Sequence, residues 1–259
     1  AEGWQRCVAA RQHLSGSLHQ LERELAGFVT PEYETSLRRA FADAAGVLVV
    51  NPLIAELCKP YSQAVHVIPS GFDPARFPWT DFRDDSISSA TPTTLLFAGL
   101  PQEAMKGFPV LLEACRQLWS RRQDFRLQVT AEPGDFHEPF CEFLGWQSQH
   151  ELPLRMRAAD VIVCPTIAEE ALGRTAVEAM GAWRPVVASR IGGLPFTVLD
   201  EATGLLCRPG DAADLARQLE RLLEDAELRE RLGRNGRRRF ESEFTWPVIL
   251  ERGYRPLLG

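Results

Sequence analysis

Cys-Pro-Thr-Ile-Ala-Glu-Glu-Ala-Leu-Gly-Arg-Thr-Ala-Val-Glu-Ala-Met, residues 164–180, is the stretch that decides the fold of this chain. It follows a short apolar run, residues 161–164, that is typical of a buried parallel strand, and it leads through a loop into a helix expected to begin near Gly173. A helix that begins after the carboxyl end of a strand presents free N–H groups, which suit an anion. Glu170 and Glu178 are eight residues apart, about 12 Å if the whole span were helical. Two carboxylates so placed would reach opposite ends of an elongated ligand that carries a phosphate between them.

Strands and helices alternate on both sides of this stretch. Before it, we expect them in turn at residues 95–98, 108–119, 125–130, 142–144 and 151–158. After it, we expect them at residues 186–188, 204–207, 211–224, 226–240 and 246–256. Residues 131–140 interrupt the alternation, and we expect a loop or a single turn there. The pattern predicts an α/β fold with a Rossmann-like, doubly wound parallel sheet.

The first part of the chain has a different organisation. Helices are expected at residues 5–26, 31–45 and 52–58, and short strands at residues 46–50 and 64–68. Residues 77–92 are polar and rich in Ser, Asp and Pro, which indicates a loop or linker. Because the chain begins with Ala1 and not Met, we expect a truncated or processed product.

The composition excludes several classes of protein. The net charge of −6 gives no general affinity for nucleic acid, and no apolar run approaches the ~18 residues of a membrane span. The six cysteines form no C-x-x-C pair, so we expect reduced thiols in a cytoplasmic protein. The five histidines show no metal-ligand spacing, and no Gly-x-Gly-x-x-Gly follows a strand, which argues against a dinucleotide redox site.

The pair Glu170-x7-Glu178 resembles the E-x7-E motif of retaining GT-B glycosyltransferases, family 4 in particular. The preceding strand, the Gly-Arg-Thr at the helix start and the strand at 185–189 make the resemblance specific, and it covers roughly residues 40–250. Pro-Ser-Gly-Phe-Asp, residues 69–73, is similar to the interdomain linker of that family. The resemblance implies the C-terminal half of a GT-B fold. We therefore expect residues 1–73 to be a partial remnant of the acceptor-side domain plus the linker, residues 74–245 to be the nucleotide-sugar-binding domain, and residues 246–259 to be a helix that packs back toward the N-terminal part.

The resemblance also implies roles for individual residues. Glu170 would contact the donor sugar near the reacting carbon, Glu178 would accept hydrogen bonds from the ribose hydroxyls, and Lys106 would bind the diphosphate. Glu170 and Lys106 are the expected catalytic residues. The expected substrate-binding residues are Gly99, Trp146, Leu172, Gly173, Arg174, Thr175 and Glu178.

Each of these residues has a plainer interpretation. Glu178 would otherwise be a solvated glutamate on an amphipathic helix, Glu170 a carboxylate placed by the helix dipole, and Lys106 a solvated lysine. Trp146 suits a nucleobase-stacking face and a core position about equally.

Two positions depart from the family pattern. Leu100 stands where the family usually has an arginine that joins the lysine on the diphosphate, and Phe196 replaces a glutamate that often follows the Gly-Gly-x-Pro loop at 192–195. We interpret that loop as structural. The basic run at 234–239 lies at a helix end, where cations suit the helix dipole, and contact with a membrane surface is the alternative.

The expected function is that of a retaining, hexosyltransferase-type glycosyltransferase, which moves a sugar from a UDP-, GDP- or ADP-linked donor to an acceptor hydroxyl in glycan or glycoconjugate biosynthesis. No metal or other cofactor is expected, because the chain has no Asp-x-Asp, the metal-diphosphate signature of the other large glycosyltransferase fold. The acceptor is a glycan, a lipid-linked or a small molecule, and the expected location is the cytoplasm or the inner face of the membrane. The alternative is a non-catalytic or truncated nucleotide-sugar-binding module that needs a separate acceptor domain; a GT-B-fold epimerase is disfavoured by the E-x7-E pair. The donor nucleotide and sugar, the acceptor and the oligomeric state are left open.

Overall fold

A computed structural model describes residues 31–82 and 92–258 of the chain. The chain divides into two compact units, residues 1–69 and 70–259, which are described separately. The helix expected at residues 5–26 lies outside the described residues. No helix within the described ranges is both long and apolar enough to cross a bilayer.

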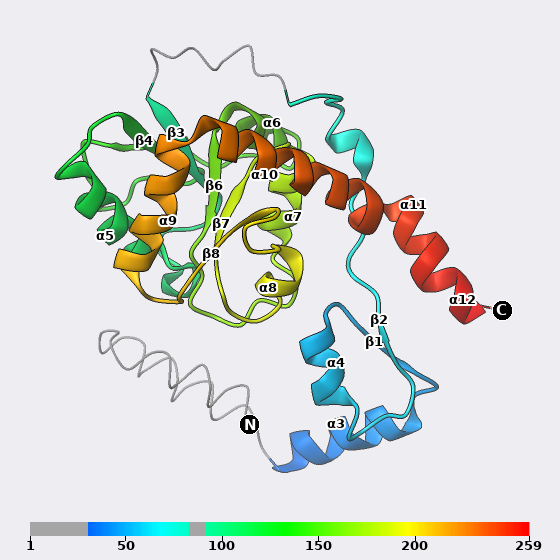
Figure 1. Cartoon of the computed structure of the whole chain (residues 1–259). Coiled ribbons are helices and arrows are strands. Elements are labelled where there is room, and N and C mark those ends of the chain that lie inside the picture. The colour runs from blue at the N-terminus through cyan, green and yellow to red at the C-terminus, as the bar shows by residue number, and fades with distance from the viewer. Residues whose placement is uncertain (1–30, 83–91, 259) are drawn as a thin grey trace. The chain divides into compact units, whose positions relative to one another are not determined.

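The described part of the first unit, residues 31–69, contains two helices and a small parallel sheet (Figure 1). Its described elements are α3 (Pro31–Asp43), β1 (Val47–Val49), α4 (Pro52–Cys58) and β2 (Val65–Val67). Strands β1 and β2 pair in parallel, with Val47 opposite Val65. Helix α4 begins where the Asn51 side chain accepts a hydrogen bond from the Ile54 amide, which satisfies one N–H of the first turn. The expected strands at 46–50 and 64–68 and the expected helix at 52–58 are therefore present.

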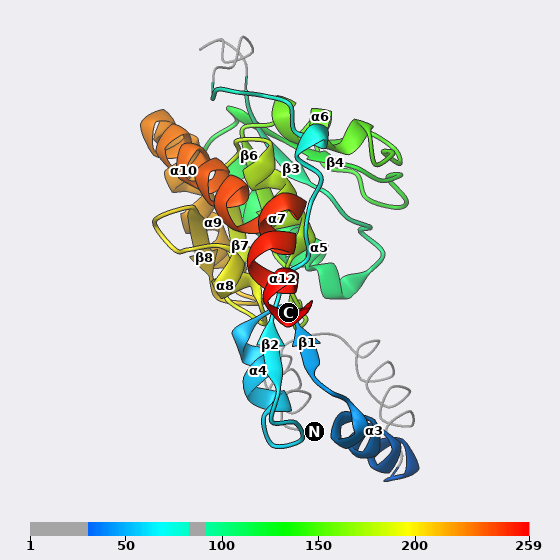
Figure 2. The same ribbon diagram turned by 90° about the vertical axis from the view of Figure 1, so that its right-hand side faces the viewer.

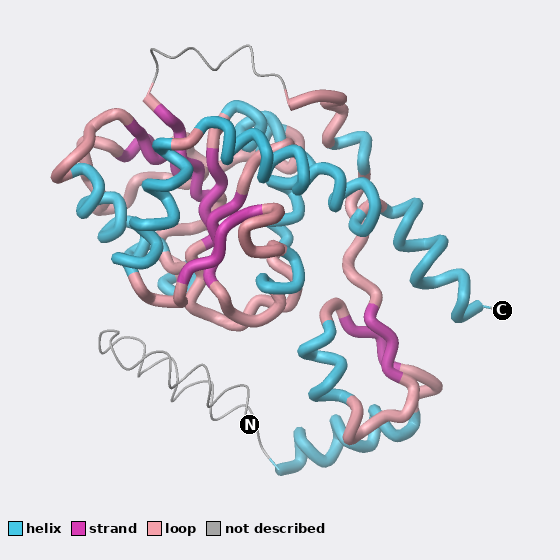
Figure 3. The backbone as a smooth tube through the Cα atoms, in the orientation of Figure 1, coloured by secondary structure: helices cyan, strands magenta, loops and turns pink. Residues whose placement is uncertain are grey.

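The second unit is built on a parallel sheet of six strands among the described residues, in the order β5-β4-β3-β6-β7-β8 (Figures 1 and 3). The strands are β3 (Thr93–Phe97), β4 (Phe125–Val129), β5 (Cys141–Phe143), β6 (Val161–Cys164), β7 (Val186–Ser189) and β8 (Gly204–Cys207). The helices between and after them are α5 (Phe108–Trp119), α6 (Glu151–Ala158), α7 (Arg174–Gly181), α8 (Leu194–Thr197), α9 (Ala212–Glu224) and α10 (Ala226–Arg239). The predicted Rossmann-like, doubly wound fold is confirmed.

Helices cover both faces of the sheet. Connections between parallel strands are right-handed. When the chain adds strands toward one edge of the sheet, its helices therefore lie on one face, and when it adds strands toward the other edge, they lie on the opposite face. Accordingly, α5 packs against α9 on one face, and α7 packs against α6 and α10 on the other (Figure 1). The strands are buried on both faces: every residue of β7 and β8 is buried, in contrast to the alternation of a half-exposed strand.

The strand order reverses between β3 and β6. From β3 the chain proceeds to β4 and β5 on one side, and from β6 it proceeds to β7 and β8 on the other. The connections that leave the carboxyl ends of β3 and β6 therefore lead to opposite sides of the sheet. Open α/β sheets bind their ligands at such a topological switch point.

Helix α10 bears out the helix expected at 226–240, whereas the segment after it differs from the regular helix expected at 246–256. After α10, residues 240–244 and 250–254 form π-helical turns, which flank α11 (Trp246–Ile249), and α12 (Arg255–Leu258) follows. Figures 1 and 2 show α10, α11 and α12 in sequence as a bent rod. The bend lies at Thr245, whose backbone is extended and bridges Phe72, while the Trp246 amide donates to the Phe72 carbonyl at 3.0 Å. These bonds hold residues 70–73 in the second unit together with residues 246–258, so the observed division falls between Pro69 and Ser70.

Candidate functional site

Two candidate residues meet at the switch point. Lys106 closes the 3-10 turn η2 (Ala104–Lys106) after β3, and Glu170 lies in the loop after β6. The Lys106 Nζ and the Glu170 Oε1 are 2.7 Å apart, and both side chains are partly exposed. A lysine just before the first turn of α5 faces an unfavourable helix dipole. The Glu170 carboxylate supplies the negative charge that offsets it.

Close main-chain contacts hold the two loops together. The Thr166 hydroxyl and the Ile167 amide both donate to the Met105 carbonyl, at 2.9 and 3.0 Å. Gly107 adopts a φ of +75°, and a Cβ at that position would overlap the Pro165 carbonyl oxygen. Only glycine permits both the left-handed conformation and this approach. Lys106 is thereby fixed beside the loop that carries Glu170.

The Gly192-Gly193 loop holds the main chain of Glu170. The Gly193 amide donates to the Glu170 carbonyl at 2.6 Å. Gly192 has a φ of +57°, and a Cβ there would lie 2.5 Å from the Glu170 carbonyl oxygen and 2.6 Å from its amide nitrogen. The loop that we interpreted as structural is thus a direct support of a candidate catalytic residue. It also continues into the one-turn helix α8, which the sequence analysis missed.

Helix α7 begins at Arg174, with Gly173 as its N-cap and no side-chain cap. The first helical main-chain bonds run from the Ala176 and Val177 amides to the Gly173 carbonyl, so the amides of Arg174 and Thr175 have no partner within the helix. Leu172 is buried, and its carbonyl accepts a hydrogen bond from the Thr197 hydroxyl. The predicted start near Gly173 is correct. Glu170 lies outside the helix, so the 12 Å expected for a wholly helical span does not apply.

Glu178 lies within α7 and is only 6% exposed. The interpretation of a solvated glutamate is therefore wrong. Its Oε1 accepts a hydrogen bond from Arg76 Nη1 at 3.4 Å, and no other described residue donates to the carboxylate. Burial raises the pKa of Glu178, while the charges of Arg76 and Arg174 act to lower it. A buried carboxylate with a single long hydrogen bond has unused acceptor capacity.

Arg76 is the residue of this site that the sequence analysis missed. It ends the 3-10 turn η1 (Pro74–Arg76), 102 positions before its partner Glu178. No local pattern marks such a pair, because the fold alone brings the two together. The only sequence signal is its place shortly after the linker motif at residues 69–73.

The charges of three candidate residues act on the thiol of Cys164. Its pKa is raised to about 12, first by burial, then by Glu170 and Glu178, while Lys106 acts in the opposite direction. Cys164 is the last residue of β6, so all three charged groups act at the carboxyl end of that strand. The thiol itself stays protonated at neutral pH.

The remaining candidates differ in how far they are available to a ligand. Trp146 is 74% exposed, so the interpretation as a core residue is wrong. Arg174 is exposed, and its guanidinium lies over the Phe72 ring at 4.8 Å. Gly99 is half-buried, two residues after β3 ends at Phe97, and Leu100 is exposed where an arginine was expected. No residue within the described loop after β3 replaces that arginine, since Lys106 is its one basic residue.

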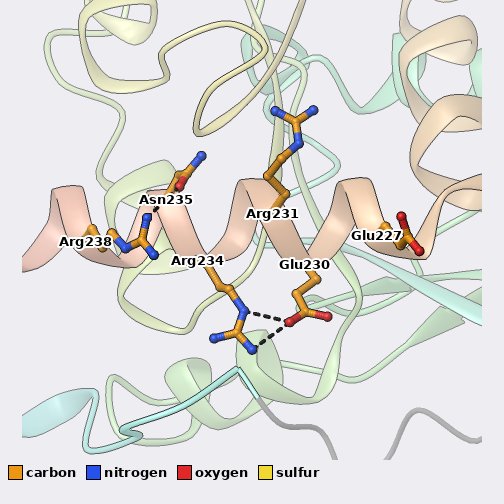
Figure 4. A pocket seen from close by; sticks show the side chains of 6 residues that line it. All are labelled: Glu227, Glu230, Arg231, Arg234, Asn235 and Arg238. Carbon is orange, nitrogen blue, oxygen red and sulfur yellow. Dashed lines mark hydrogen bonds and ion pairs between the residues drawn. The ribbon is translucent and has the colours of Figure 1, made fainter.

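A pocket on α10 lies apart from these residues in the sequence and shares none of them (Figure 4). It is lined by Glu227, Glu230, Arg231, Arg234, Asn235 and Arg238. Its two acidic side chains lie toward the start of α10 and its three arginines follow them along the helix, and Arg234 donates to Glu230 at 2.7 Å. In the basic run, Arg237 is buried and donates to the Phe77 and Gly181 carbonyls. At least this arginine of the run has a structural role. Among the described residues, no three His, Cys, Asp or Glu side chains are grouped to hold a metal.

Comparison with known proteins finds similar sequences and similar folds. Residues 137–239 match the family model described as glycosyl transferases group 1. The chain is 33% identical, over 60% of its length, to a D-inositol 3-phosphate glycosyltransferase of Corynebacterium kroppenstedtii, and it spans 38% of that relative.

Among solved structures, a sucrose-phosphate synthase of Thermosynechococcus elongatus aligns with a TM-score of 0.75 and 27% identity, over 97% of this chain and 65% of that one. HepE of Anabaena, solved in complex with UDP, aligns with a TM-score of 0.74 and 21% identity, over 89% of this chain and 70% of that one. The sheet is that of the C-terminal domain of GT-B glycosyltransferases.

Proposed function

We propose that this chain is the donor-binding half of a group 1 glycosyltransferase, which transfers a sugar from a nucleotide-linked donor to an acceptor hydroxyl. The observation that carries the proposal is the contact of Lys106 with Glu170 at the carboxyl ends of β3 and β6, together with the buried Glu178 in helix α7 that follows. The match of residues 137–239 to the group 1 model supports it. So does the structural likeness to HepE, which was solved with UDP.

Glu178, Trp146 and Glu170 suit three parts of a nucleotide sugar. Glu178 has acceptor oxygens and no donor, which fits two adjacent ribose hydroxyls. Trp146 offers an exposed aromatic face to the nucleobase. Glu170, held by the Gly192-Gly193 loop, would contact the hexose near its reacting carbon. Gly99 and Leu172 would line the site through their main chain and apolar surface.

The diphosphate is the leaving group. Lys106, Arg174 and the free amides at the start of α7 would stabilise the negative charge that develops on it, and such preorganised charge is usually the largest catalytic contribution. We propose retention of the anomeric configuration. The bond from the sugar carbon to the phosphate oxygen breaks, the acceptor oxygen forms its bond on the same face, and the leaving phosphate oxygen takes the acceptor proton. We expect no metal cofactor, because Lys106 and Arg174 would supply positive charge to the leaving group.

We expect this chain to transfer sugar poorly without a complete acceptor-side domain. Closure of two domains excludes water from the reaction, and the chain spans less than half of the relative named above. A non-catalytic binding module is the second candidate, which the exposed Leu100 in place of a cation favours. The proposed location is the cytoplasm or the inner face of the membrane, and the acceptor is a glycan, a lipid-linked or a small molecule.

Transfer assays on a product that includes an acceptor-side domain test the enzyme proposal. Incubation with radiolabelled UDP-, GDP- and ADP-hexoses should release one nucleoside diphosphate, and Lys106→Ala should slow its release with little change in fold. If the longer product binds a nucleotide sugar but neither transfers nor hydrolyses it, the binding-module proposal is correct and the enzyme proposal is wrong.

A further inference from the structure

The side chain of Arg76 joins two parts of the candidate site. Its Nη1 donates to Glu178 Oε1 at 3.4 Å, and its Nη2 donates to the Gln149 carbonyl at 2.7 Å. Gln149 follows Trp146 by three residues, in the segment that precedes α6. A guanidinium presents its donors in a fixed plane, so one group can fix two acceptors relative to each other. Arg76 thereby ties the expected ribose-binding carboxylate to the main chain beside the expected nucleobase-stacking residue.

The turn that carries Arg76 is itself well fixed. The Asp73 carboxylate accepts a hydrogen bond from the Ala75 amide at 2.9 Å and caps η1. Phe77, the next residue, is fully buried, and the Arg76 guanidinium lies 5.7 Å from the centre of its ring. The Arg76 side chain is 22% exposed and the Glu178 side chain 7%. The pair is thus a largely desolvated contact, in which geometry matters more than in a surface ion pair.

The second oxygen of Glu178 receives no hydrogen bond from any described residue, and Arg76 is the only one that donates to the carboxylate. The Arg174 guanidinium is occupied with the Phe72 ring, although its charge acts on Glu178. A nearly buried carboxylate that one arginine orients through Oε1 presents its other oxygen in a defined direction.

We propose that Arg76 is a positioning residue for donor recognition, which aims Glu178 at the ribose hydroxyls and holds it in register with the nucleobase side of the site. The inference rests on the proposed function. It predicts that Arg76 contributes to discrimination between ribose and deoxyribose without touching the nucleotide itself.

Protonation of Glu178 gives a second readout of the same contact. The charged groups that act on this carboxylate are Arg76 from η1 and Arg174 from its own helix; both lower its pKa against the effect of burial. The Cys164 thiol of β6, with a pKa of about 12, is neutral at physiological pH. Loss of Arg76 should therefore raise the pKa of Glu178 further. The protonated form has lost an acceptor, so nucleotide binding should fail at a higher pH than in the wild type.

Calorimetric titration with UDP, GDP and ADP and with their 2′-deoxy analogues, between pH 5 and pH 8, tests the proposal. The variants are Arg76→Ala, Arg76→Lys, Glu178→Gln and the double variant Arg76→Ala/Glu178→Gln. Arg221→Ala is the matched control, because Arg221 forms an exposed two-bond pair with Glu201 at 2.7 and 2.8 Å, outside the candidate site. Unfolding curves verify that each variant is folded. The double variant removes the buried unpaired carboxylate if Arg76→Ala alone is unstable.

Arg76→Ala should weaken binding of the preferred ribonucleotide by about 10-fold, because a misdirected Glu178 would lose about one hydrogen bond to the ribose. It should weaken binding of the 2′-deoxy analogue by less. As the pH is lowered, Arg76→Ala should begin to lose nucleotide affinity at a higher pH than the wild type. The double variant should bind like Glu178→Gln, because both changes act through one carboxylate. Arg76→Lys should restore the pH profile of binding more fully than the discrimination between ribose and deoxyribose, because lysine keeps the positive charge but not the planar donor geometry.

The inference would be overturned if Arg76→Ala discriminated between ribonucleotide and 2′-deoxynucleotide as the wild type does and showed the wild-type pH profile of binding. It would also be overturned if the losses of affinity in the two single variants multiplied in the double variant. Failure of the wild type to bind any of the nucleotides would instead overturn the proposed function on which it rests.

Discussion

Replacement of Gly192 by alanine tests how Glu170 is held. The added Cβ would lie 2.5 and 2.6 Å from main-chain atoms of Glu170 and 3.0 Å from the Glu169 carboxylate. Main-chain atoms cannot rotate away as a flexible side chain can, so the loop at 192–193 or the segment at 170 must move. The φ of +57° adds left-handed strain of about 1–2 kcal/mol. Forced overpacking typically adds about 1–3 kcal/mol.

The chain offers a matched control in Gly210. Its φ of +74° is similarly left-handed, but a Cβ there would meet nothing within 4 Å. Gly210→Ala should therefore show the strain alone, reduced slightly by the lower entropy of the unfolded chain. The difference between the two variants isolates the close approach to Glu170, and we expect it to be about 1–3 kcal/mol in the free energy of unfolding.

Urea unfolding of both variants measures that difference, and calorimetry with UDP and UDP-glucose measures its functional consequence. A displaced Glu170 should reduce the extra affinity that the hexose contributes, while the affinity for UDP changes little. Equal destabilisation of Gly192→Ala and Gly210→Ala would refute the packing argument. An unchanged preference for UDP-glucose over UDP would refute the role assigned to the loop.

Three further predictions concern the charged and aromatic groups of the site. Lys106→Ala should weaken UDP binding by about 10-fold and flatten its salt dependence, but leave uridine binding unchanged; an equal loss for both ligands would exclude a phosphate contact. Trp146→Ala should leave the free energy of unfolding within about 0.5 kcal/mol, because the side chain is 74% exposed, yet cost about 1–3 kcal/mol of nucleotide affinity if it stacks on the base; wild-type affinity would contradict stacking. Because the native pKa of Glu178 is raised, its contribution makes the protein most stable below the unfolded pKa, and this contribution falls as the pH rises through the native value. Nucleotide affinity should show the opposite trend and fall as the pH drops through the native pKa of Glu178. The phosphate groups of the ligand also titrate, but they do so equally with the wild type and with Glu178→Gln. The difference between the two pH profiles therefore isolates the contribution of Glu178.

Much of the fold followed from short-range pattern. Apolar runs such as 161–164 and 204–207 identified buried strands, and Asp211 marked the start of α9, where its carboxylate accepts from the Asp214 amide at 2.8 Å. Local propensity and burial act on neighbouring residues, so the sequence reports them directly. The π-helical turns near Phe240 and Leu250 were not predicted, because the Phe72–Thr245 bridge that interrupts the helix is a long-range contact.

Candidate residues of the site could be named where a local pattern carries them, as in the motif at 164–180 and at Lys106 before α5. Glu170, Gly173 and Glu178 lie within one motif, which the structure shows as the loop after β6 and helix α7. The support of Glu170 by Gly192 and the contact of Glu178 with Arg76 depend on segments distant in the sequence. A glycine loop and a linker arginine look ordinary until the fold brings them to the carboxylates.

Titration of the chain with UDP, GDP, ADP and their hexose conjugates tests the central claim most directly, with Glu178→Gln as the site variant. Glu169→Gln is the control, since Glu169 is an exposed glutamate adjacent to Glu170 in the same loop. The account predicts saturable binding of one nucleotide series that weakens about 10-fold or more in Glu178→Gln and is unchanged in Glu169→Gln. Absence of binding to every nucleotide, or equal affinity of the wild type and Glu178→Gln, would contradict a donor site at the carboxyl ends of β3 and β6.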